Sequence, residues 1–534
     1  MSDAYDGAFD VIVVGFGGAG ACAAIAAADA GARVLVLDRG FGGGSTYHSG
    51  GVVYAGAGTD EQKAAGIVDT PEDMLAYLQI ETDGVVADET LKRFVDNSPA
   101  MIRWLEQQGL EWEGSVCPYK TSYPTNRHYL YYSGNELAGG YAEVAKPAPR
   151  GHRTRAKNFS GATFYHRLRD SALRKGVVFR PLAEVTDLVV EDGRVVGVEY
   201  LGVDNEPGAG YRALATLAAK LNIWYAPVGS RLNNIVERRR RRLSTTHQTR
   251  AGAVVLSTGG HSFNRELVAA HAPKWSKVPP LGTIGDDGAN LRLGAQVNAK
   301  TAHLESMSGW RFISPPSSFM EGIVVGRNGI RFANEQLYGA TMAKPLIEDH
   351  DSNGYLVMDA RAWKRARGNL REQTAFFHAP QVVYLFSPIG HVKAKSVAEL
   401  AGKIGVDAAG LGDTIASYNA AIAAGAKDEF GKHEDFRKPI GQAPFYAIDI
   451  SIPNSPAYPA AAITLGGLVV DETTGGVVDE DGKAVPGLFA AGRAAVGICS
   501  RSYVSGLSLA DAVFSGRRAG EHAAARTTRS PQGA

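Results

Sequence analysis

The sequence predicts an α/β protein in which one domain is assembled from both ends of the chain and an α+β domain is inserted between them. Three observations predict this arrangement. The chain opens with a strand–loop–helix–strand pattern whose loop is rich in glycine. Glycine is concentrated at both ends, since residues 1–60 hold 14 of the 64 glycines and residues 461–520 hold another 11. The stretch between them, near residues 270–445, carries mixed helix and strand signals.

The composition excludes several classes of protein. A chain of 534 residues is too long for one ordinary core, so we expect two or more domains. Lys and Arg total 56 against 55 Asp and Glu, and this balance gives no electrostatic case for a nucleic-acid-binding protein. The three cysteines are scattered and form no C-x-x-C pair, which argues against a disulfide framework and fits a reducing compartment. The 13 histidines show no metal-ligand spacing, so we expect no metal.

The N-terminal residues do not resemble a signal peptide, and no apolar run reaches the roughly 18 residues of a membrane-spanning helix. We therefore expect a cytoplasmic protein, with peripheral membrane association left open.

The elements of the first domain follow in order. Residues 9–14 (FDVIVV) form an apolar run typical of a short buried strand. The alanine-rich residues 19–30 predict a helix that ends at Gly31, because glycine commonly terminates helices. Residues 33–37 (RVLVL) predict a second strand. Together they form a βαβ unit, which favours a parallel sheet.

Later segments add to this domain. Residues 71–110 are amphipathic and predict helices, with Pro71 near a helix start. Residues 177–200 predict a meander of strands with a turn at Asp192, which precedes a glycine. Residues 251–256 (AGAVVL) predict another buried strand.

Residues 115–158 are rich in Tyr, Pro and Arg and read as an excursion from the domain. Its tyrosines either line an apolar pocket or lie on a surface loop, and the sequence leaves both alternatives open for Tyr119, Tyr123, Tyr129, Tyr131 and Tyr132.

We therefore expect residues 1–270 to form the first part of the terminal domain, residues 271–445 the inserted catalytic domain, and residues 446–534 the second part of the terminal domain. An insertion at about 205–250 contains an apolar helical stretch followed by five consecutive arginines, 238–242. This insertion is either a solvated helical hairpin or a basic amphipathic element that rests on a membrane surface.

The early glycine loop is a G-x-G-x-x-G motif between a predicted strand and a predicted helix. The first glycine permits the tight turn, the second lets the backbone approach a pyrophosphate, and the third lets the helix pack on the strand. The N–H groups at the helix start favour phosphate. An acid that ends the second strand would bind a ribose hydroxyl. The motif predicts a Rossmann-like dinucleotide site made by Gly15, Gly17, Gly18, Ala19, Gly20, Asp38 and Arg39.

Five further segments indicate which dinucleotide is bound. They are GGSTYHSGG at 43–51, STGG at 257–260, TLGGL at 464–468, PGLFAAGR at 486–493 and SGLSLADAVFSGR at 505–517. In combination these motifs resemble the flavoproteins of the fumarate reductase and succinate dehydrogenase superfamily. The resemblance covers most of the chain. It implies a glutathione-reductase-type FAD-binding domain whose last segment returns to cover the flavin.

The resemblance also implies the FAD contacts. Backbone atoms of Val185 would contact the adenine, and Ser508 and Leu509 would lie at the pyrimidine end of the isoalloxazine. The remaining expected contacts come from the small-residue loops, at Ser45, Thr46, Ser49, Gly50, Gly51, Thr258, Gly259, Gly492 and Arg493.

This chain departs from the family pattern at two positions. Arg493 stands where the family often has Glu. His48 does not occupy the place of the histidine that links FAD covalently in some members, so we expect non-covalent FAD. Because only one dinucleotide fingerprint is present, we expect the electrons to leave to an external acceptor.

Two motifs indicate the substrate. The RF-x-NE motif at 331–335 is followed by Tyr338 where the dicarboxylate enzymes of the superfamily carry an arginine. The C-terminal motif reads Tyr503-Val504-Ser505-Gly506, and Arg501 is offset from the arginine of those enzymes. Arginine forks bind carboxylates bidentately, so their replacement argues against a small diacid. The pattern is similar to that of the 3-ketosteroid dehydrogenases, and Tyr-x-Ser-Gly favours the Δ4-(5α) group over the Δ1 group.

The resemblance implies a reaction in which Tyr503 supports enolisation at the 3-keto oxygen and Ser505 takes the C4 proton and relays it to Tyr338. The C5 hydrogen would leave as a hydride to N5 of FAD, giving a 4-ene-3-ketone. Three alternatives stay open: a Δ1-ketosteroid dehydrogenase, a fumarate-reductase-like flavin ene-reductase, and a flavin-binding sensor or scaffold without turnover.

Overall fold

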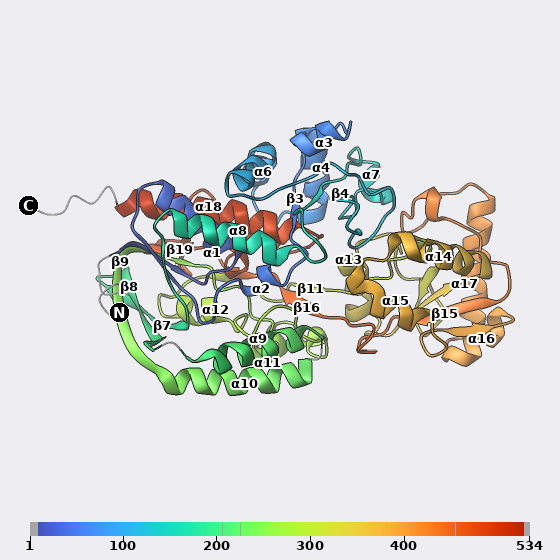
Figure 1. Cartoon of the computed structure of the whole chain (residues 1–534). Coiled ribbons are helices and arrows are strands. Elements are labelled where there is room, and N and C mark those ends of the chain that lie inside the picture. The colour runs from blue at the N-terminus through green and yellow to red at the C-terminus, as the bar shows by residue number, and fades with distance from the viewer. Residues whose placement is uncertain (1–8, 206, 225, 454, 528–534) are drawn as a thin grey trace, which may run out of the picture.

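Strands from both ends of the chain lie side by side in one sheet (Figure 1). The structure is a computed structural model that describes residues 9–205, 207–224, 226–453 and 455–527. The strands of this sheet are β1 (Phe9–Val14), β2 (Val34–Leu37), β6 (Val178–Arg180), β7 (Ala183–Glu191), β8 (Arg194–Val203), β9 (Ser244–Leu256), β18 (Gly476–Val478) and β19 (Ala484–Ala490). The main order is β18-β19-β9-β1-β2-β6, with β7 and β8 attached through β9. The late strand β19 pairs in parallel with β9, which pairs in parallel with β1.

Beside this sheet, helix α1 (Gly18–Asp29) packs against both α8 (Gly161–Arg174) and α18 (Leu507–Thr527). Helix α1 is rich in alanine, and its residues are almost all buried. Helix α18 approaches it closely at two glycines. A Cβ on Gly516 would lie 2.5 Å from the carbonyl oxygen of Ala19, and a Cβ on Gly520 would lie 2.2 Å from that of Ala23. These late glycines are therefore required by a helix–helix contact.

A second region with its own sheet lies at one end of the molecule, at the right in Figure 1. Its four strands are antiparallel in the order β12-β13-β15-β14, with bounds β12 (Ile323–Val325), β13 (Tyr355–Met358), β14 (Val392–Ala394) and β15 (Phe445–Asp449). The helices around this sheet are α13 (Gly339–Glu348), α14 (Ala360–Gln373), α15 (Ala379–Phe386), α16 (Val397–Ile404) and α17 (Ala408–Ala423). Two separate apolar clusters form on it, and each contains alternate residues of the strands.

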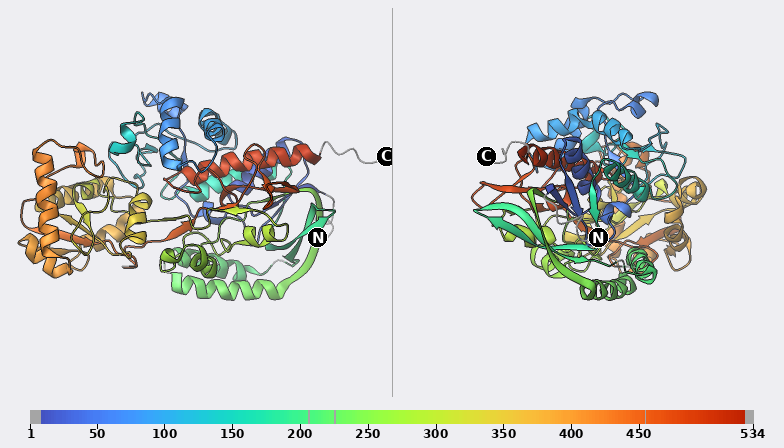
Figure 2. Two further views of the ribbon diagram at one scale, coloured as in Figure 1. Left: turned by 180° about the vertical axis from the view of Figure 1, so that it is seen from behind. Right: turned by 60° about the vertical axis from the view of Figure 1, so that its left-hand side comes forward.

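A strand pair leads from this region back to the main sheet, made by β11 (Met307–Gly309) and β16 (Ala462–Thr464). Figure 2 shows the same arrangement from behind, with the two regions at opposite ends of an elongated molecule. The remaining short elements are α2 (Gly44–Tyr47), α11 (Arg265–His271), α12 (Ala289–Ala295), β10 (Thr301–Ala302) and β17 (Gly467–Leu468).

The amphipathic stretch and the Tyr-rich excursion together form a cap above the main sheet (Figure 1). The cap consists of α3 (Asp60–Ala64), α4 (Pro71–Thr82), α5 (Asp88–Asp96), α6 (Ser98–Gln107), α7 (Gly139–Ala142) and a three-stranded sheet of β3 (Val52–Tyr54), β4 (Leu130–Tyr131) and β5 (Gly151–Arg153). Tyr123, Tyr129 and Tyr131 are buried here, whereas Tyr119 and Tyr132 are partly buried. The excursion is therefore an interior element, and the surface-loop alternative is wrong for three of its tyrosines.

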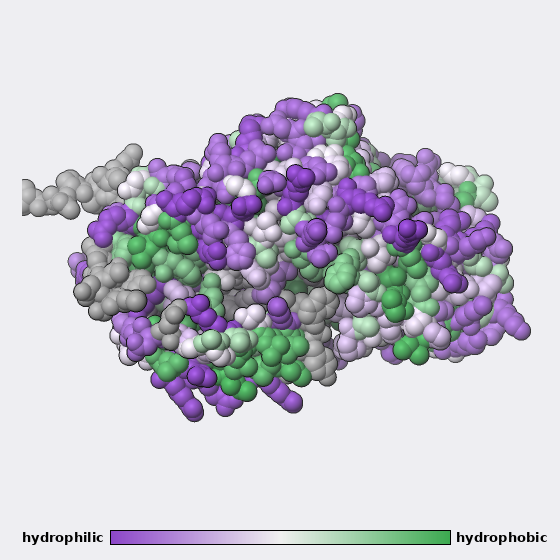
Figure 3. Space-filling model, viewed as in Figure 1, coloured by the Kyte–Doolittle hydropathy of each residue, from purple (hydrophilic) through white to green (hydrophobic). Residues whose placement is uncertain are grey.

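The insertion at 205–250 is a hairpin of two helices, α9 (Ala209–Trp224) and α10 (Ala226–Leu243), beneath the main sheet. Figure 3 shows apolar surface over this hairpin, bordered by hydrophilic residues. Among the side chains of the hairpin that the structure describes, the large apolar ones that are exposed are Leu217, Val228, Ile235 and Leu243. Among the residues that the structure describes, no helix is long and apolar enough to cross a membrane. A peripheral membrane contact of the hairpin stays a prediction.

The strands and helices expected at the start of the chain are confirmed to within one residue at each end. The helical stretch 71–110 divides into three helices, and the meander 177–200 is β6, β7 and β8. The strand expected at 251–256 begins earlier, at Ser244, because the polar residues that precede it pair with β8.

Candidate active site

The glycines of the G-x-G-x-x-G loop have three different surroundings. Gly15 has φ +95°, and a Cβ there would lie 2.6 Å from the carbonyl oxygen of Ser257. A Cβ on Gly20 would lie 2.0 Å from the carbonyl oxygen of Gly15. Gly17 is open by contrast, with its nearest neighbour the carbonyl oxygen of Gly43 at 3.9 Å. The first and third glycines therefore hold the turn together, and the second offers free space for a pyrophosphate.

Asp38, at the end of β2, organises the loops on both sides of this turn. One of its carboxylate oxygens accepts a hydrogen bond from the backbone N–H of Phe16 at 2.7 Å, and the other accepts from Gly40 at 2.7 Å. Arg39 follows it and forms ion pairs with Asp287 and Glu237. The carboxylate thus lies beside the loop, and its binding of a ribose hydroxyl stays a prediction.

Arg493 belongs to a polar cluster that includes Ser45 and Asp286. Its guanidinium lies 2.5 Å from the Asp286 carboxylate and donates to Ser45 Oγ at 3.1 Å. Ser45 in turn donates to Asp286 at 2.6 Å. The departure from the family's Glu therefore has a physical reason, because a Glu here would face another carboxylate. The structure brings together Ser45 and Arg493, two expected FAD contacts, and joins them to Asp286.

The expected FAD contacts of the second small-residue loop are held by hydrogen bonds to neighbouring segments. Thr46 Oγ1 accepts from the N–H of Gly18 at 3.0 Å, which joins the second loop to the start of α1. The Ser49 hydroxyl holds its own turn, donating to the Thr46 carbonyl at 2.8 Å and accepting from the Gly51 N–H at 3.1 Å. Tyr123 donates to the carbonyl of Gly50 at 2.8 Å, so the cap also fixes this loop.

Glycine is required at two further expected contacts. Gly259 has φ +80° and Gly492 has φ +60°, and a Cβ on Gly492 would lie 2.8 Å from that of Ala19. Ser508 and Leu509 begin α18, next to the segment that carries Tyr503.

The residues around the first loop fit a dinucleotide. Thr258 Oγ1 and Arg493 Nη1 are buried and have no hydrogen-bond partner within the described part of the chain. Buried polar atoms are normally paired, so both positions are ready for ligand oxygens. With the open face of Gly17 and the N–H groups that start α1, they suit a group rich in phosphate and hydroxyl oxygens, as FAD is.

Ser505 lies beside Tyr131, which belongs to the cap sheet. Its hydroxyl is 3.0 Å from the hydroxyl of Tyr131, which is fully buried on β4. Its carbonyl accepts a hydrogen bond from Ser133 at 2.9 Å. Gly506, with φ +95°, accepts from the N–H of Tyr54 at 3.0 Å. The cap sheet therefore fixes the backbone and the side chain of Ser505.

The rings of Tyr338 and Tyr503 have centroids 6.0 Å apart, although they come from the inserted region and the C-terminal segment. Burial raises the pKa of Tyr503 to about 12, with Cys499 adding to the shift. Burial also raises the pKa of Tyr338 well above its usual value, and Tyr503 and Tyr131 add to that shift. All three expected catalytic residues thus meet in one place, and both phenols are protonated at neutral pH.

Tyr131 is the fourth residue of this group. Burial raises its pKa, so it too is a neutral hydroxyl. The sequence offered only a general signal, since Tyr131 was one of five tyrosines in the excursion. The direction of the Tyr131 side chain depends on the pairing of β4 with β5, and the sequence of the excursion does not predict that pairing.

A buried carboxylate connects the segments that carry Tyr338 and Tyr503. Glu81 on α4 accepts hydrogen bonds from Ser502 at 2.7 Å and from the side-chain amide of Asn135 at 2.9 Å. Asn135 in turn accepts from the backbone N–H of Tyr338 at 2.7 Å. Burial raises the pKa of Glu81, and the donated hydrogen bonds oppose that shift. These hydrogen bonds fix the segment of Tyr338 relative to the segment of Tyr503.

Two aromatic side chains form an apolar side of the Tyr338 environment. Phe312 packs on Tyr338 with ring centroids 5.4 Å apart, and Trp310 packs on Phe312 at 5.6 Å. The nearby arginines are engaged elsewhere: Arg501 bonds to Asp83, and Arg331 pairs with Glu335 and Asp428. A carboxylate clamp is therefore not formed by the arginines of these two motifs.

Comparisons with known proteins agree with this geometry. A family model described as an FAD binding domain matches residues 10–506. A 3-oxo-5-alpha-steroid 4-dehydrogenase from Comamonas testosteroni is 39% identical, over 91% of this chain and 92% of its own length.

Two crystal structures were also compared. That of a 3-ketosteroid Δ4-(5α)-dehydrogenase from Rhodococcus jostii RHA1, in complex with 4-androstene-3,17-dione, has a TM-score of 0.80 at 29% identity and covers 97% of both chains. That of a 3-ketosteroid Δ1-dehydrogenase from Sterolibacterium denitrificans has a TM-score of 0.65 at 20% identity and covers 97% of this chain and 99% of its own, which shows a shared fold.

These findings confirm the expected superfamily and the α/β FAD-binding fold. The chain belongs to the FAD-binding-domain family of flavoproteins, in the group that includes 3-oxo-5α-steroid 4-dehydrogenase.

Proposed function

We propose that this protein is an FAD-dependent 3-ketosteroid Δ4-(5α)-dehydrogenase, which introduces a C4–C5 double bond into 5α-reduced 3-ketosteroids. One observation carries the proposal. Ser505 is held by Tyr131 at 3.0 Å in the same place where the rings of Tyr338 and Tyr503 meet. The identity to the Comamonas testosteroni dehydrogenase, over nearly the whole length of both chains, supports the same activity.

The reaction needs a donor at the ketone, a base at C4 and a hydride acceptor at C5. Tyr503 is the donor, because its pKa of about 12 keeps the phenol protonated while it hydrogen-bonds the 3-keto oxygen. Polarising this carbonyl makes the C4 proton acidic. FAD, when bound, supplies the acceptor for the hydride that leaves C5.

Ser505 accepts the C4 proton. A serine hydroxyl is a weak base, so it must release its own proton as it gains the new one. Tyr338 receives that proton and passes it towards solvent. Tyr131 is a positioning residue that donates to Ser505 Oγ and stabilises the negative charge that develops there. The substrate loses one proton and one hydride, and the product is a 4-ene-3-ketone.

The FAD is held without a covalent bond. His48 follows α2 and lies beside Tyr47, with ring centroids 5.0 Å apart, and burial lowers its pKa. Acid precipitation of the holoenzyme should release all of the flavin into the supernatant; flavin that stays with the protein would contradict this. The electrons then leave to an external acceptor, for which an artificial dye can substitute in an assay.

Product analysis tests the proposed regiochemistry. A 5α-reduced 3-ketosteroid should yield the 4-ene-3-ketone. A product with a 1,2 double bond and a saturated C4–C5 bond would instead show a Δ1 enzyme. Robust reduction of fumarate with a reduced viologen dye would overturn the steroid assignment.

A further inference from the structure

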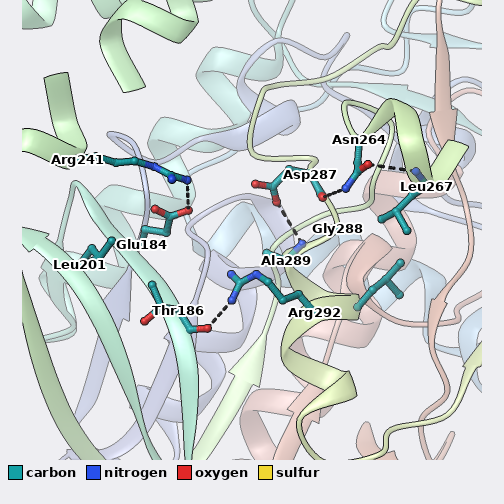
Figure 4. A pocket seen from close by; sticks show the side chains of 11 residues that line it. Glu184, Thr186, Leu201, Arg241, Asn264, Leu267, Asp287, Gly288, Ala289 and Arg292 are labelled. Atoms are coloured by element: carbon teal, nitrogen blue, oxygen red, sulfur yellow. Dashed lines mark hydrogen bonds and ion pairs between the residues drawn. The ribbon is translucent and has the colours of Figure 1, made fainter. Parts of the chain in front are cut away.

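A cavity of about 650 Å³ opens between β7, α12 and the inserted helix α10 (Figure 4). Its walls carry both acceptors and donors. Glu184 and Asp287 contribute carboxylates, and Arg241 and Arg292 contribute guanidinium groups. Leu201 is one of the apolar side chains that line it. A planar, polar heterocycle suits such a lining, because it can stack on flat guanidinium groups and use both donors and acceptors.

The position of the cavity relates it to one end of the dinucleotide. Arg39 directly follows Asp38, which is expected to bind the ribose, and it forms ion pairs with two residues of the cavity wall, Asp287 and Glu184. Arg292 donates to the backbone carbonyl of Val185 at 3.1 Å, and this is the residue expected to contact adenine. The wall of the cavity therefore contacts Arg39 and Val185, which the family resemblance assigns to the FAD site.

The inserted hairpin is fixed against this end of the site by charged side chains. Arg240, which is 2% exposed, pairs with Glu184 of β7 and with Glu237 of its own helix. Glu237 also pairs with Arg39 at 3.3 Å. Burial alone would raise the pKa of Glu237, but Arg240 and Arg39 lower this pKa to about 2. The network ties α10 to β2 and β7 at once.

The five consecutive arginines therefore differ in their surroundings. Arg240 faces inward, and Arg241 reaches the cavity, where it lies 3.2 Å from Glu237 and 3.8 Å from Glu184. Arg242 is exposed on the same helix, as Arg241 is, but only Arg241 lines the cavity. The chain therefore offers a matched pair of neighbouring arginines, one beside the cavity and one away from it.

We propose that α10 forms an outer wall of the adenosine end of the FAD site, with Arg241 contacting the adenosine moiety from the side opposite α12. The proposal rests on FAD as the cofactor but not on the identity of the substrate. It gives the insertion a cofactor-retaining role. On this account Arg240 anchors the helix and the exposed Arg241 beside the cavity serves the cofactor.

The test is the affinity of the apoprotein for FAD, measured by flavin fluorescence titration. Arg241→Ala should raise the Kd about 10-fold through loss of a direct contact, whereas Arg242→Ala should stay within twofold of the wild type. Unchanged affinity in Arg241→Ala would overturn the proposal. An equal loss in both variants would also overturn it, because that result indicates only long-range attraction of the phosphates.

A second variant distinguishes the loss of FAD binding from a folding defect. Leu201→Trp adds bulk to the cavity without removing a charge, so it should also weaken FAD binding about 10-fold while the melting temperature of the apoprotein stays unchanged. Full FAD affinity in this variant would contradict an adenosine site. Ketosteroid turnover of the wild type at saturating FAD is measured separately. FAD binding that depends on Arg241 without any turnover would refute the proposed function and leave this inference standing.

Discussion

The hydroxyl oxygens of Tyr131 and Ser505 lie 3.0 Å apart, although 374 residues separate them along the chain. The contact joins the cap sheet to the segment that enters α18. Ser133 reinforces it by donating to the Ser505 carbonyl at 2.9 Å. A serine is a poor base unless its hydroxyl is oriented and its developing charge is stabilised. Tyr131 can do both, and it is fully buried with its pKa raised, so it remains a neutral donor.

Replacing Tyr131 by Phe should therefore lower kcat about 10- to 100-fold while FAD stays bound, because the donor to Ser505 is lost but the ring still packs. Steady-state kinetics and the flavin content of the purified protein check this. Tyr129→Phe is the matched control, since its hydroxyl bonds only to the Ala156 carbonyl among the described residues. Equal activity of Tyr131→Phe and the control would remove Tyr131 from the mechanism.

Ser505→Ala should abolish C4 proton removal, lowering turnover about 100-fold or more, because no other group is placed as the base. Exchange of the C4 protons of the substrate with deuterated water, followed by NMR, reports this step separately from hydride transfer. The variant should lose the exchange and keep its FAD. Exchange at the wild-type rate would show that another group acts as the base.

The pH profile should show no loss of activity from ionisation of Tyr503 below about pH 11. The protonated phenol is the active form, and it is present below its pKa and lost as pH rises through about 12. Initial rates from pH 7 to 10.5 check this, with stability monitored in parallel. An alkaline limb near pH 9 that disappears in Tyr503→Phe would contradict the assigned pKa.

Asp511 predicts a pH-dependent stability. Burial raises its pKa from 3.8 to about 6, with Arg518 opposing the shift. An acid with a raised pKa in the folded state stabilises the protein below its unfolded pKa, and this contribution is lost as pH rises to about 6. The loss corresponds to about 3 kcal/mol at 1.36 kcal/mol per pKa unit.

Denaturant unfolding between pH 4 and pH 8 measures this effect. Asp511→Asn, which cannot ionise, should remove most of that pH dependence. The same slope in both proteins would show that other groups cause it.

Much of the first domain could be predicted because its signals are local. The run at 9–14, the glycine loop and the helix that ends near Gly31 each follow from short-range patterns, and the structure confirms them. The convergence of Tyr338, Tyr503 and Ser505 was expected only through the family resemblance, and it depends on contacts between segments far apart in sequence.

The features that the sequence did not predict depend on contacts between segments far apart in the chain. Tyr131 and the Glu81–Asn135 link depend on how the cap folds over the C-terminal segment, and no residue pattern in the excursion records that. The ion pair of Asp286 with Arg493 likewise joins segments far apart in the sequence. The concentration of glycine near the C-terminus did not specify that Gly516 and Gly520 allow the close contact of α18 with α1.

Anaerobic mixing of the holoenzyme with a 5α-reduced 3-ketosteroid tests the central claim most directly. The oxidised-flavin absorbance should be lost at a rate that supports turnover, and the product recovered from the same mixture should be the 4-ene-3-ketone in an amount equal to the flavin reduced. Unchanged flavin absorbance, or a product whose new double bond lies at C1–C2, would contradict the account.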